Sequence, residues 1–144
     1  MGGIVGIFSR SKAAPSQTYD TEFIPEESSV YVRGVSFRQA ALKKLGVGKH
    51  VFALVAEPTN PADEHAVRVM GMQSGGLLHV GYLPGGEKAT EALQNLSLAM
   101  AARGKLPVVN GVIKKRDAGL VVDLKRPSMP TMKALMKGLS GTDS

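Results

Sequence analysis

The sequence contains no cysteine and no tryptophan, and aromatic residues make up only 5% of its 144 residues. Without cysteine the chain can form no disulfide, no thiolate metal site and no cysteine nucleophile. This fits a cytoplasmic protein, because disulfides belong to oxidising compartments. With so few aromatic residues, any surface that stacks on flat ligands must be small.

Long apolar runs and catalytic motifs are also missing. No stretch of 18 or more apolar residues occurs, so we expect no transmembrane helix and no membrane partner. His50, His65 and His79 are scattered and no carboxylate cluster accompanies them, so neither a metal site nor a cofactor is expected. The phosphate-loop spacing and the nucleophile elbow are absent too. We therefore expect that the protein is not an enzyme.

Positive charge is concentrated in the larger part of the chain. The formal net charge is +6, from 18 basic and 12 acidic residues. Only two basic and four acidic residues lie up to Val30, which leaves 16 basic and 8 acidic residues after it. A basic folded region favours a polyanion such as nucleic acid or an anionic membrane surface. On charge alone, a role limited to solubility explains this composition equally well.

Three segments differ in their composition. Residues 1–28 open with a short apolar run and continue with a polar stretch, which predicts a flexible leader outside the main fold. Residues 29–126 alternate between β-prone runs, turn residues and helical patterns, and we expect them to form the folded domain. Residues 127–144 predict a C-terminal tail with a short helix, either packed on the domain or docked to another protein.

Six short β-prone runs and two helical patterns define the expected fold. Helices are predicted over residues 36–46, where Ser36 can cap the first turn, and over residues 87–103. Short connections favour antiparallel pairing, and a small sheet avoids open edges by curling into a barrel. We therefore predict a mainly β protein, a small antiparallel β-barrel of about six strands flanked by two α-helices. The strands are expected at residues 30–32, 50–56, 66–70, 77–83, 107–113 and 120–124.

The most informative stretch is a turn between two predicted strands, within residues 54–70. Two prolines at positions 58 and 61 fix φ at about −65° and remove two backbone donors, which makes the connection rigid. Asn60 and Asp63 can bond their own neighbouring backbone, as such residues do in turns. The sequence therefore predicts a stiff corner that holds polar side chains in a fixed geometry: Glu57, Asn60, Asp63, Glu64 and His65.

The corner resembles the central motif of the HIRAN domain family, Glu-Pro-x-Asn-Pro-x-Asp-x-x-Ala-Val, at residues 57–67. Two flanking pieces fall where that family has them: Val32-Arg33-Gly34 upstream, and Val80-Gly81-Tyr82-Leu83-Pro84 before a predicted helix. The resemblance covers residues 30–125 and suggests a stand-alone member of bacterial or phage type. It implies a small β-barrel related to the OB and SH3-like folds, and a DNA-binding role.

Asp63 has two interpretations. As a structural residue, its carboxylate caps the turn and holds the first amides of the next strand. As a functional residue, the resemblance implies that it helps to bind a free 3′-hydroxyl end of single-stranded DNA. Ala62 stands where DNA-binding family members have an aromatic residue, and Ser36 stands where an arginine is often used. These two departures remove a stacking face and a phosphate contact.

The resemblance places further residues in the same site. Phe37 and Tyr82 would contact the last bases or sugars, although a Tyr82 packed in the core is an equal alternative. Arg38 or Arg68 would offset phosphate charge. The candidate DNA-binding residues are therefore Ser36, Phe37, Arg38, Asn60, Asp63, Arg68 and Tyr82.

Two functional hypotheses follow. The first is a non-catalytic module that binds single-stranded DNA or 3′ ends in DNA repair or processing, and recruits a separately encoded helicase or nuclease. The second is a protein-interaction module that has lost DNA-end recognition, as Ala62 and Ser36 suggest. A basic cluster, Lys114-Lys115-Arg116, is expected in a hairpin tip, where such residues are usually only solvated but can contact phosphate.

Overall fold

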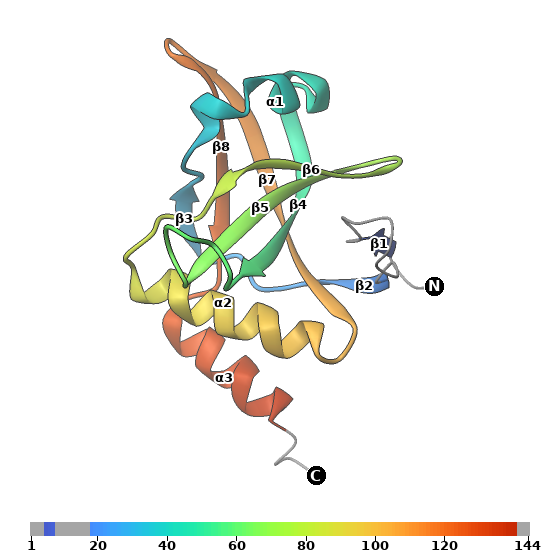
Figure 1. Ribbon diagram of the computed structural model, residues 1–144, viewed down its shortest axis with the longest axis vertical. Helices are drawn as coiled ribbons and strands as arrows, with labels where there is room; N and C mark the ends of the chain where they lie inside the picture. The colour runs from blue at the N-terminus through green and yellow to red at the C-terminus, as the bar shows by residue number, and fades with distance from the viewer. Residues whose placement is uncertain (1–4, 8–17, 141–144) are drawn as a thin grey trace.

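The computed structural model describes residues 5–7 and 18–140, and within them the chain is mainly β, as predicted (Figure 1). One sheet of eight strands is accompanied by three α-helices and one short 3-10 helix. The strands are β1 (Val5–Ile7), β2 (Thr18–Phe23), β3 (Ser28–Tyr31), β4 (Gly48–Glu57), β5 (Ala66–Gln73), β6 (Gly76–Tyr82), β7 (Lys105–Arg116) and β8 (Gly119–Arg126). The helices are η1 (Val35–Phe37), α1 (Gln39–Leu45), α2 (Lys88–Ala101) and α3 (Met129–Leu139).

The strands follow the order β1-β2-β7-β4-β5-β6, and β8 pairs with both β7 and β3. Every described strand pair is antiparallel except β2 with β7, which is parallel. The expected antiparallel pairing is therefore present, and two N-terminal strands extend the sheet. In this arrangement β6 and β3 are the two strands that would have to pair for the sheet to close.

The sheet is not closed into a barrel, and this part of the sequence prediction is wrong. The segment after β3 meets β6 at a single bridge, in which Arg33 and Tyr82 exchange backbone hydrogen bonds of 2.7 and 2.9 Å. Gly34, with φ at 77°, then turns the chain into η1. Both η1 and α1 contact β6 and β8, so helical structure lies along the seam that a barrel would close with strand pairing.

Two apolar clusters lie on opposite faces of the sheet. The larger one packs β-strand side chains such as Phe52 and Val69 against Leu93 and Leu96 of α2, all fully buried. The smaller one lies on the other face and joins Met70 and Met72 of β5 to buried residues of β4 and β7, beside Tyr19 of β2. A β-bulge between Val69 and Met70 adjusts the register of β5 against β6.

The expected flexible leader, residues 1–28, contains part of the sheet. Residues 18–23 form β2, which runs along β7 from Lys105 to Val108, and Ile24 is buried in the larger cluster. The sequence does not predict β2, because Thr-Tyr-Asp-Thr-Glu-Phe lacks the apolar alternation of a half-buried strand. Residues 1–4 and 8–17 of the predicted leader lie outside the described residues.

The C-terminal helix packs on the domain, which is one of the two alternatives that its sequence left open. Ser128 caps α3 by accepting a hydrogen bond from the Thr131 amide, and Met132 is 1% exposed within the larger core cluster. Glu27 accepts hydrogen bonds from the Ser128 amide at 2.7 Å and from the Thr131 hydroxyl at 3.0 Å. These bonds lower the pKa of the Glu27 carboxyl. The start of α3 is therefore fixed to the segment before β3.

Two local predictions need correction. The predicted helix over 36–46 begins only at Gln39, so Ser36 caps nothing; it lies in η1, and Gly46 ends α1 as expected. The Gln39 side chain instead bonds the backbone of Leu120 across 81 residues, at 3.0 and 2.9 Å. The basic cluster 114–116 lies on β7 rather than in a turn, because the hairpin extends to Arg116 and Gly119.

Within residues 5–7 and 18–140, none of the helices has both the length and the apolar character needed to cross a membrane.

Candidate nucleic-acid interface

The corner between β4 and β5 is held by its own side chains, as its sequence predicted. The Asn60 Oδ1 atom accepts hydrogen bonds from the amides of Ala62 at 2.8 Å and Asp63 at 3.1 Å. One carboxylate oxygen of Asp63, Oδ1, accepts from the His65 amide at 2.9 Å. These bonds satisfy three backbone donors in a segment that has no regular partner strand. The corner is therefore fixed before any ligand binds.

Helix α2 supports the corner through polar side chains on its buried face. Gln94 donates to the carbonyl of Glu64 at 2.7 Å and to that of Ala66 at 3.3 Å. Thr90 donates to the Pro84 carbonyl at 2.6 Å, which fixes the segment between β6 and α2. Buried polar side chains are tolerated because each has a hydrogen-bond partner. Thr90 and Gln94 therefore hold the corner and the segment between β6 and α2 in one relative position.

Glu57, the last residue of β4, is the centre of a polar network. The Tyr82 hydroxyl donates to Glu57 Oε1 at 2.8 Å, and the Asn60 amide donates to the same oxygen at 3.1 Å. The Asn60 amide also reaches the Tyr82 hydroxyl at 3.4 Å. The Arg68 Nε atom forms an ion pair with Glu57 Oε1 at 4.0 Å, and among the described residues it has no hydrogen-bond partner. The network therefore joins the corner to both β5 and β6.

Charge and burial shift the ionisation of this network. Burial alone would raise the pKa of Glu57, but hydrogen bonds from Asn60 and Tyr82 and the nearby Arg68 together lower it. Burial and the hydrogen bond to the Glu57 carboxylate raise the pKa of the Tyr82 phenol, against the opposing charges of Arg68 and Arg38. Glu57 is thus held as an anion, and Tyr82 as a neutral donor.

Arg38 and His79 lie beside the network. Burial, followed by the positive charge of Arg38, lowers the pKa of His79, whose Nε2 atom lies 3.0 Å from the Gly81 carbonyl. The His79 ring meets the Tyr82 ring edge to face, with centroids 4.9 Å apart. These interactions bring Arg38, at the start of α1, close to the β6 side of the site. Arg38 therefore lies near His79 and Tyr82, while Arg68 lies near the Glu57 carboxylate.

Asp63 keeps one oxygen available at the edge of the corner. Its side chain is half-buried, and Oδ2 accepts no hydrogen bond from residues 5–7 or 18–140. Oδ2 lies close to Gly85, where an added Cβ would sit 3.1 Å from it. The absence of a side chain at position 85 therefore leaves this oxygen room. The structural interpretation of Asp63 is confirmed, because Oδ1 caps the turn, and its role in binding a 3′-hydroxyl stays a prediction.

The predicted site residues divide into two groups. Asn60, Asp63, Arg68 and Tyr82 lie in or beside the network, and the charge of Arg38 reaches it. Ser36 and Phe37 lie on η1, which contacts β6, but within the described chain no side-chain hydrogen bond or ring contact joins them to the network. Phe37 is 87% exposed. An exposed aromatic side chain at the margin of a charged site is free to contact a ligand.

Glu57 and His79 belong to the site, although they were not among the predicted site residues. Glu57 carried a signal, since it begins the family motif and ends a strand. His79 carried none that one sequence could reveal, because its place depends on the pairing of β5 with β6. That pairing sets Arg68 opposite Tyr82 and Met70 opposite His79. The register is therefore what gathers these side chains.

Four hollows on the described surface lie away from Asp63, although one of them includes Arg68 of the network. One of about 190 Å³ includes Arg68, Tyr19 and Lys105, and a second of about 510 Å³ lies over β4, β7 and β8. A third lies at the β7–β8 turn, and a fourth lies between α2 and α3. None of the four is lined by Asp63, Phe37 or Tyr82.

The sheet and its corner define a small β domain that presents an arginine-flanked polar site. A family model described as HIRAN domain matches residues 25–122, and the chain belongs to the HIRAN domain family. This family comprises DNA-binding modules of nucleic-acid processing, so the chain carries a nucleic-acid-binding domain. No curated protein and no solved structure matched the chain in the corresponding comparisons.

Proposed function

We propose that the protein is a non-catalytic module that binds single-stranded DNA, with preference for a free 3′-hydroxyl end, in DNA repair or processing. The observation that carries this proposal is the unused Oδ2 acceptor of Asp63, held by a corner that is rigid without ligand. A 3′-hydroxyl is a donor, which a carboxylate accepts, whereas a 3′-phosphate is an anion, which a carboxylate repels.

The neighbouring residues have complementary tasks in this proposal. Arg38 and Arg68 lower the electrostatic cost of bringing phosphates next to Glu57 and Asp63. Phe37, at the margin, offers a stacking face for a base near the end of the strand, in place of the aromatic side chain that Ala62 lacks. Glu57 and Tyr82 keep the corner and β6 in register, so their contribution is to position the others.

The proposal is tested by fluorescence anisotropy with labelled single-stranded oligonucleotides that differ only in a 3′-hydroxyl or a 3′-phosphate. The 3′-hydroxyl strand is expected to bind about tenfold more tightly, as a hydrogen bond to a charged group implies. Asp63→Asn removes the charge while the side chain still offers an oxygen to the His65 amide, so it should reduce the difference in affinity between the 3′-hydroxyl and 3′-phosphate strands. Asp20→Asn, on β2, is the matched control and should leave it unchanged. Equal binding of both ends by the wild-type protein would overturn the proposal.

A module of this kind needs a partner that carries out the chemistry. We expect a separately encoded helicase or nuclease, recruited to the strand end by the bound module. Because the Asp63 carboxylate would hold the terminal hydroxyl through a hydrogen bond, the bound end stays chemically unchanged. Incubation of the protein alone with a 3′-hydroxyl strand should therefore return the strand intact, with and without added Mg²⁺.

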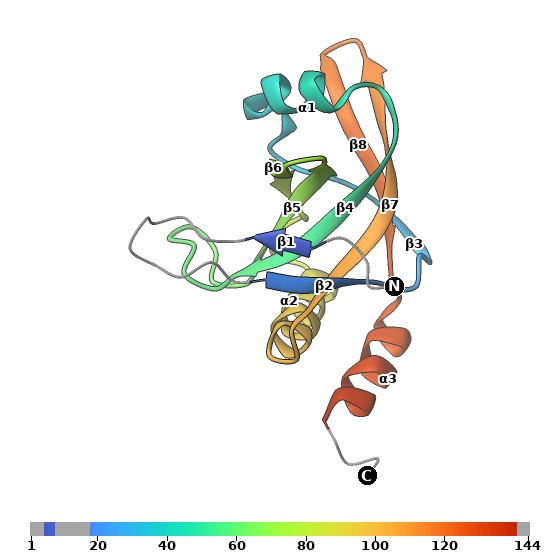
Figure 2. The ribbon, with the colours of Figure 1, turned by 90° about the vertical axis from the view of Figure 1, so that its right-hand side faces the viewer.

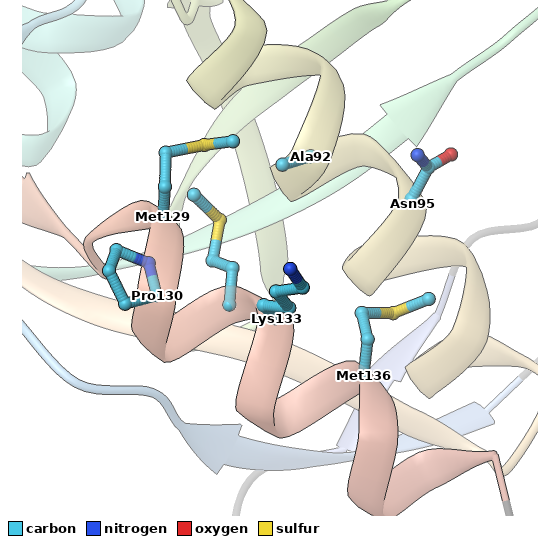
Figure 3. Close-up of a pocket in the computed structure, with 7 residues that line it drawn as sticks. Ala92, Asn95, Met129, Pro130, Lys133 and Met136 are labelled. Carbon is cyan, nitrogen blue, oxygen red and sulfur yellow. The ribbon is translucent and has the colours of Figure 1, made fainter.

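A second function, protein interaction, is favoured by one observation. A hollow of about 660 Å³ between α2 and α3 is lined mainly by apolar side chains, and Figure 3 shows Met129 of α3 on the side of Ala92 and Met136 on the side of Asn95. Methionine is common at surfaces that adapt to protein partners. Met136→Glu should abolish binding of a processing enzyme to the module and leave oligonucleotide affinity unchanged. Loss of oligonucleotide binding in this variant would instead assign the hollow to the nucleic-acid interface.

A further inference from the structure

The outer face of β3, β8, β7 and β4 carries a row of outward side chains far from the corner in sequence. Strand register sets Tyr31 opposite Asp123, Asp123 opposite Val112, and Val112 opposite Lys49. The next row sets Lys125 opposite Ser29. Because side chains alternate along strands, these rows share one face, with Val30, Val122 and Leu124 buried behind them.

This face carries more positive charge than its acids neutralise. Lys114 pairs with Asp123 at 2.8 Å and cancels that carboxylate. Glu26 accepts from the Asn110 amide at 3.0 Å and is the other acid beside the hollow. Lys49 and Lys125 line the same hollow, and neither forms an ion pair within residues 5–7 and 18–140. Unpaired cations around a hollow attract an anionic ligand.

Tyr31 supplies an aromatic side chain to the same face. Its side chain is 48% exposed, and the Arg116 Nη2 atom donates to its hydroxyl at 3.4 Å. Arg116 lies on β7 and forms no ion pair in the described chain, so its charge is not cancelled. A guanidinium beside an exposed phenol ring places a phosphate-binding group next to a stacking surface. The pair therefore has the two components that single-stranded nucleic acid needs.

The face leads directly to the corner. Along β3 and the residues after it, Ser29, Tyr31 and Arg33 alternate outward with buried Val30 and Val32. Arg33 forms the bridge to Tyr82, and η1 follows it. Helix α1 lies at the far end of the β7–β8 hairpin in both views (Figures 1 and 2), where Gln39 bonds Leu120. A strand that ends at Asp63 can therefore continue past Arg33 and onto this face.

We infer that the outer face of β3, β8, β7 and β4 is a second nucleic-acid contact surface, which holds the part of a single strand that lies 5′ of the bound end. Tyr31 stacks on a base there, and Arg116, Lys125 and Lys49 neutralise phosphates. This inference rests on the proposed function, because the strand must already be engaged at the corner. The second surface predicts that affinity increases with the length of the strand, which recognition of the 3′ end alone does not predict.

The test compares 3′-hydroxyl oligonucleotides of about 4 and about 16 nucleotides, the range that one small β domain covers. Tyr31→Ala should weaken binding of the longer strand by about tenfold and leave the shorter strand unaffected. Tyr31→Phe keeps the stacking face and should bind both strands as the wild type does. An equal loss for both lengths would mean that the variant damages the corner, and no loss for either would mean that Tyr31 touches no base; both results overturn the inference.

Salt dependence tests the charges separately. Lys125→Gln should reduce the slope of log affinity against log salt by about 0.7 for the longer strand, the value for one phosphate contact on a single strand. Lys133→Gln, on α3, makes the same charge change outside this face and should leave the slope unchanged. Equal slopes in all three proteins would contradict the inference. If no strand of either length binds the wild type, the proposed function fails; if only the length dependence is missing, this inference alone fails.

Discussion

The corner and the outer face of β3, β8, β7 and β4 are two polar surfaces that are built in different ways. At the corner, Glu57, Asn60 and Tyr82 satisfy one another, and one carboxylate oxygen of Asp63 is left over. On the outer face, Lys49 and Lys125 form no ion pair within the described residues. The first surface has fixed geometry with little free charge, and the second has free charge with little fixed geometry.

This difference matches the division of work in nucleic-acid recognition. Contacts with phosphates supply affinity and position, and they carry little information about which group is bound. Discrimination between chemical groups requires hydrogen-bond partners that are already in place. The corner therefore suits recognition of a chain end, and the outer face suits retention of the strand. The bridge between Arg33 and Tyr82 is the point at which the two surfaces are connected.

Breaking that connection should have the largest effect. In Gly81→Ala the new Cβ would lie 2.4 Å from the Arg33 carbonyl oxygen and 2.6 Å from Val32 Cγ1. Because backbone cannot move as a flexible side chain can, we expect a loss of about 3 kcal/mol in the free energy of unfolding, measured with urea. Gly138→Ala, on α3 with open space around it, is the control and should be neutral or stabilising by up to about 1 kcal/mol. Similar stability of the two variants would contradict this account of the bridge.

Removing the amide at the corner should have the next largest effect. Asn60→Ala leaves the Ala62 amide without its acceptor, leaves the Asp63 amide only the backbone carbonyl of residue 60 at 3.3 Å, and removes a donor to Glu57, so we expect a loss of about 2 kcal/mol. Asn110→Ala removes an exposed asparagine that bonds Glu26 from the edge of the other surface. It should cost less than about 0.5 kcal/mol. If Asn60→Ala and Asn110→Ala lose equal free energies of unfolding in urea, the corner is no more firmly held by its side chains than the outer face, which would contradict the comparison.

Much of the fold and part of the site follow from the sequence. The corner was predictable because proline, asparagine and aspartate act locally on their own backbone, and α2 because its apolar spacing is regular. The open seam was not predictable, since it depends on where the chain after β3 turns at Gly34. The place of β2 was not predictable either, because its parallel pairing with β7 joins residues that lie 85 apart in sequence. His79 enters the site only through the register of β5 and β6.

Acid should weaken the corner selectively, and this effect is expected to be the smallest. The folded-state pKa of Glu57 lies below its ordinary value of 4.5, so its contribution to stability is fully present above that value and is lost as the pH falls below it. The stability gap between the wild type and Glu57→Gln should therefore shrink as the pH falls below 4.5. In a Tyr82→Phe background, which lacks one donor to Glu57, the folded-state pKa lies closer to the ordinary value, so the decline should be smaller and complete at higher pH. A gap that is constant with pH would contradict the role of Glu57 as an anion.

The most direct test of the central claim is an amide NMR titration with a short single-stranded oligonucleotide that ends in a 3′-hydroxyl. The account predicts the largest shifts at the amides of Ala62, Asp63 and His65, which are bonded to the corner side chains, and at Gly85 beside the free Asp63 oxygen. Substitution of a 3′-phosphate should abolish these shifts. Shifts confined to α2 and α3, with none at the corner for either strand, would contradict it.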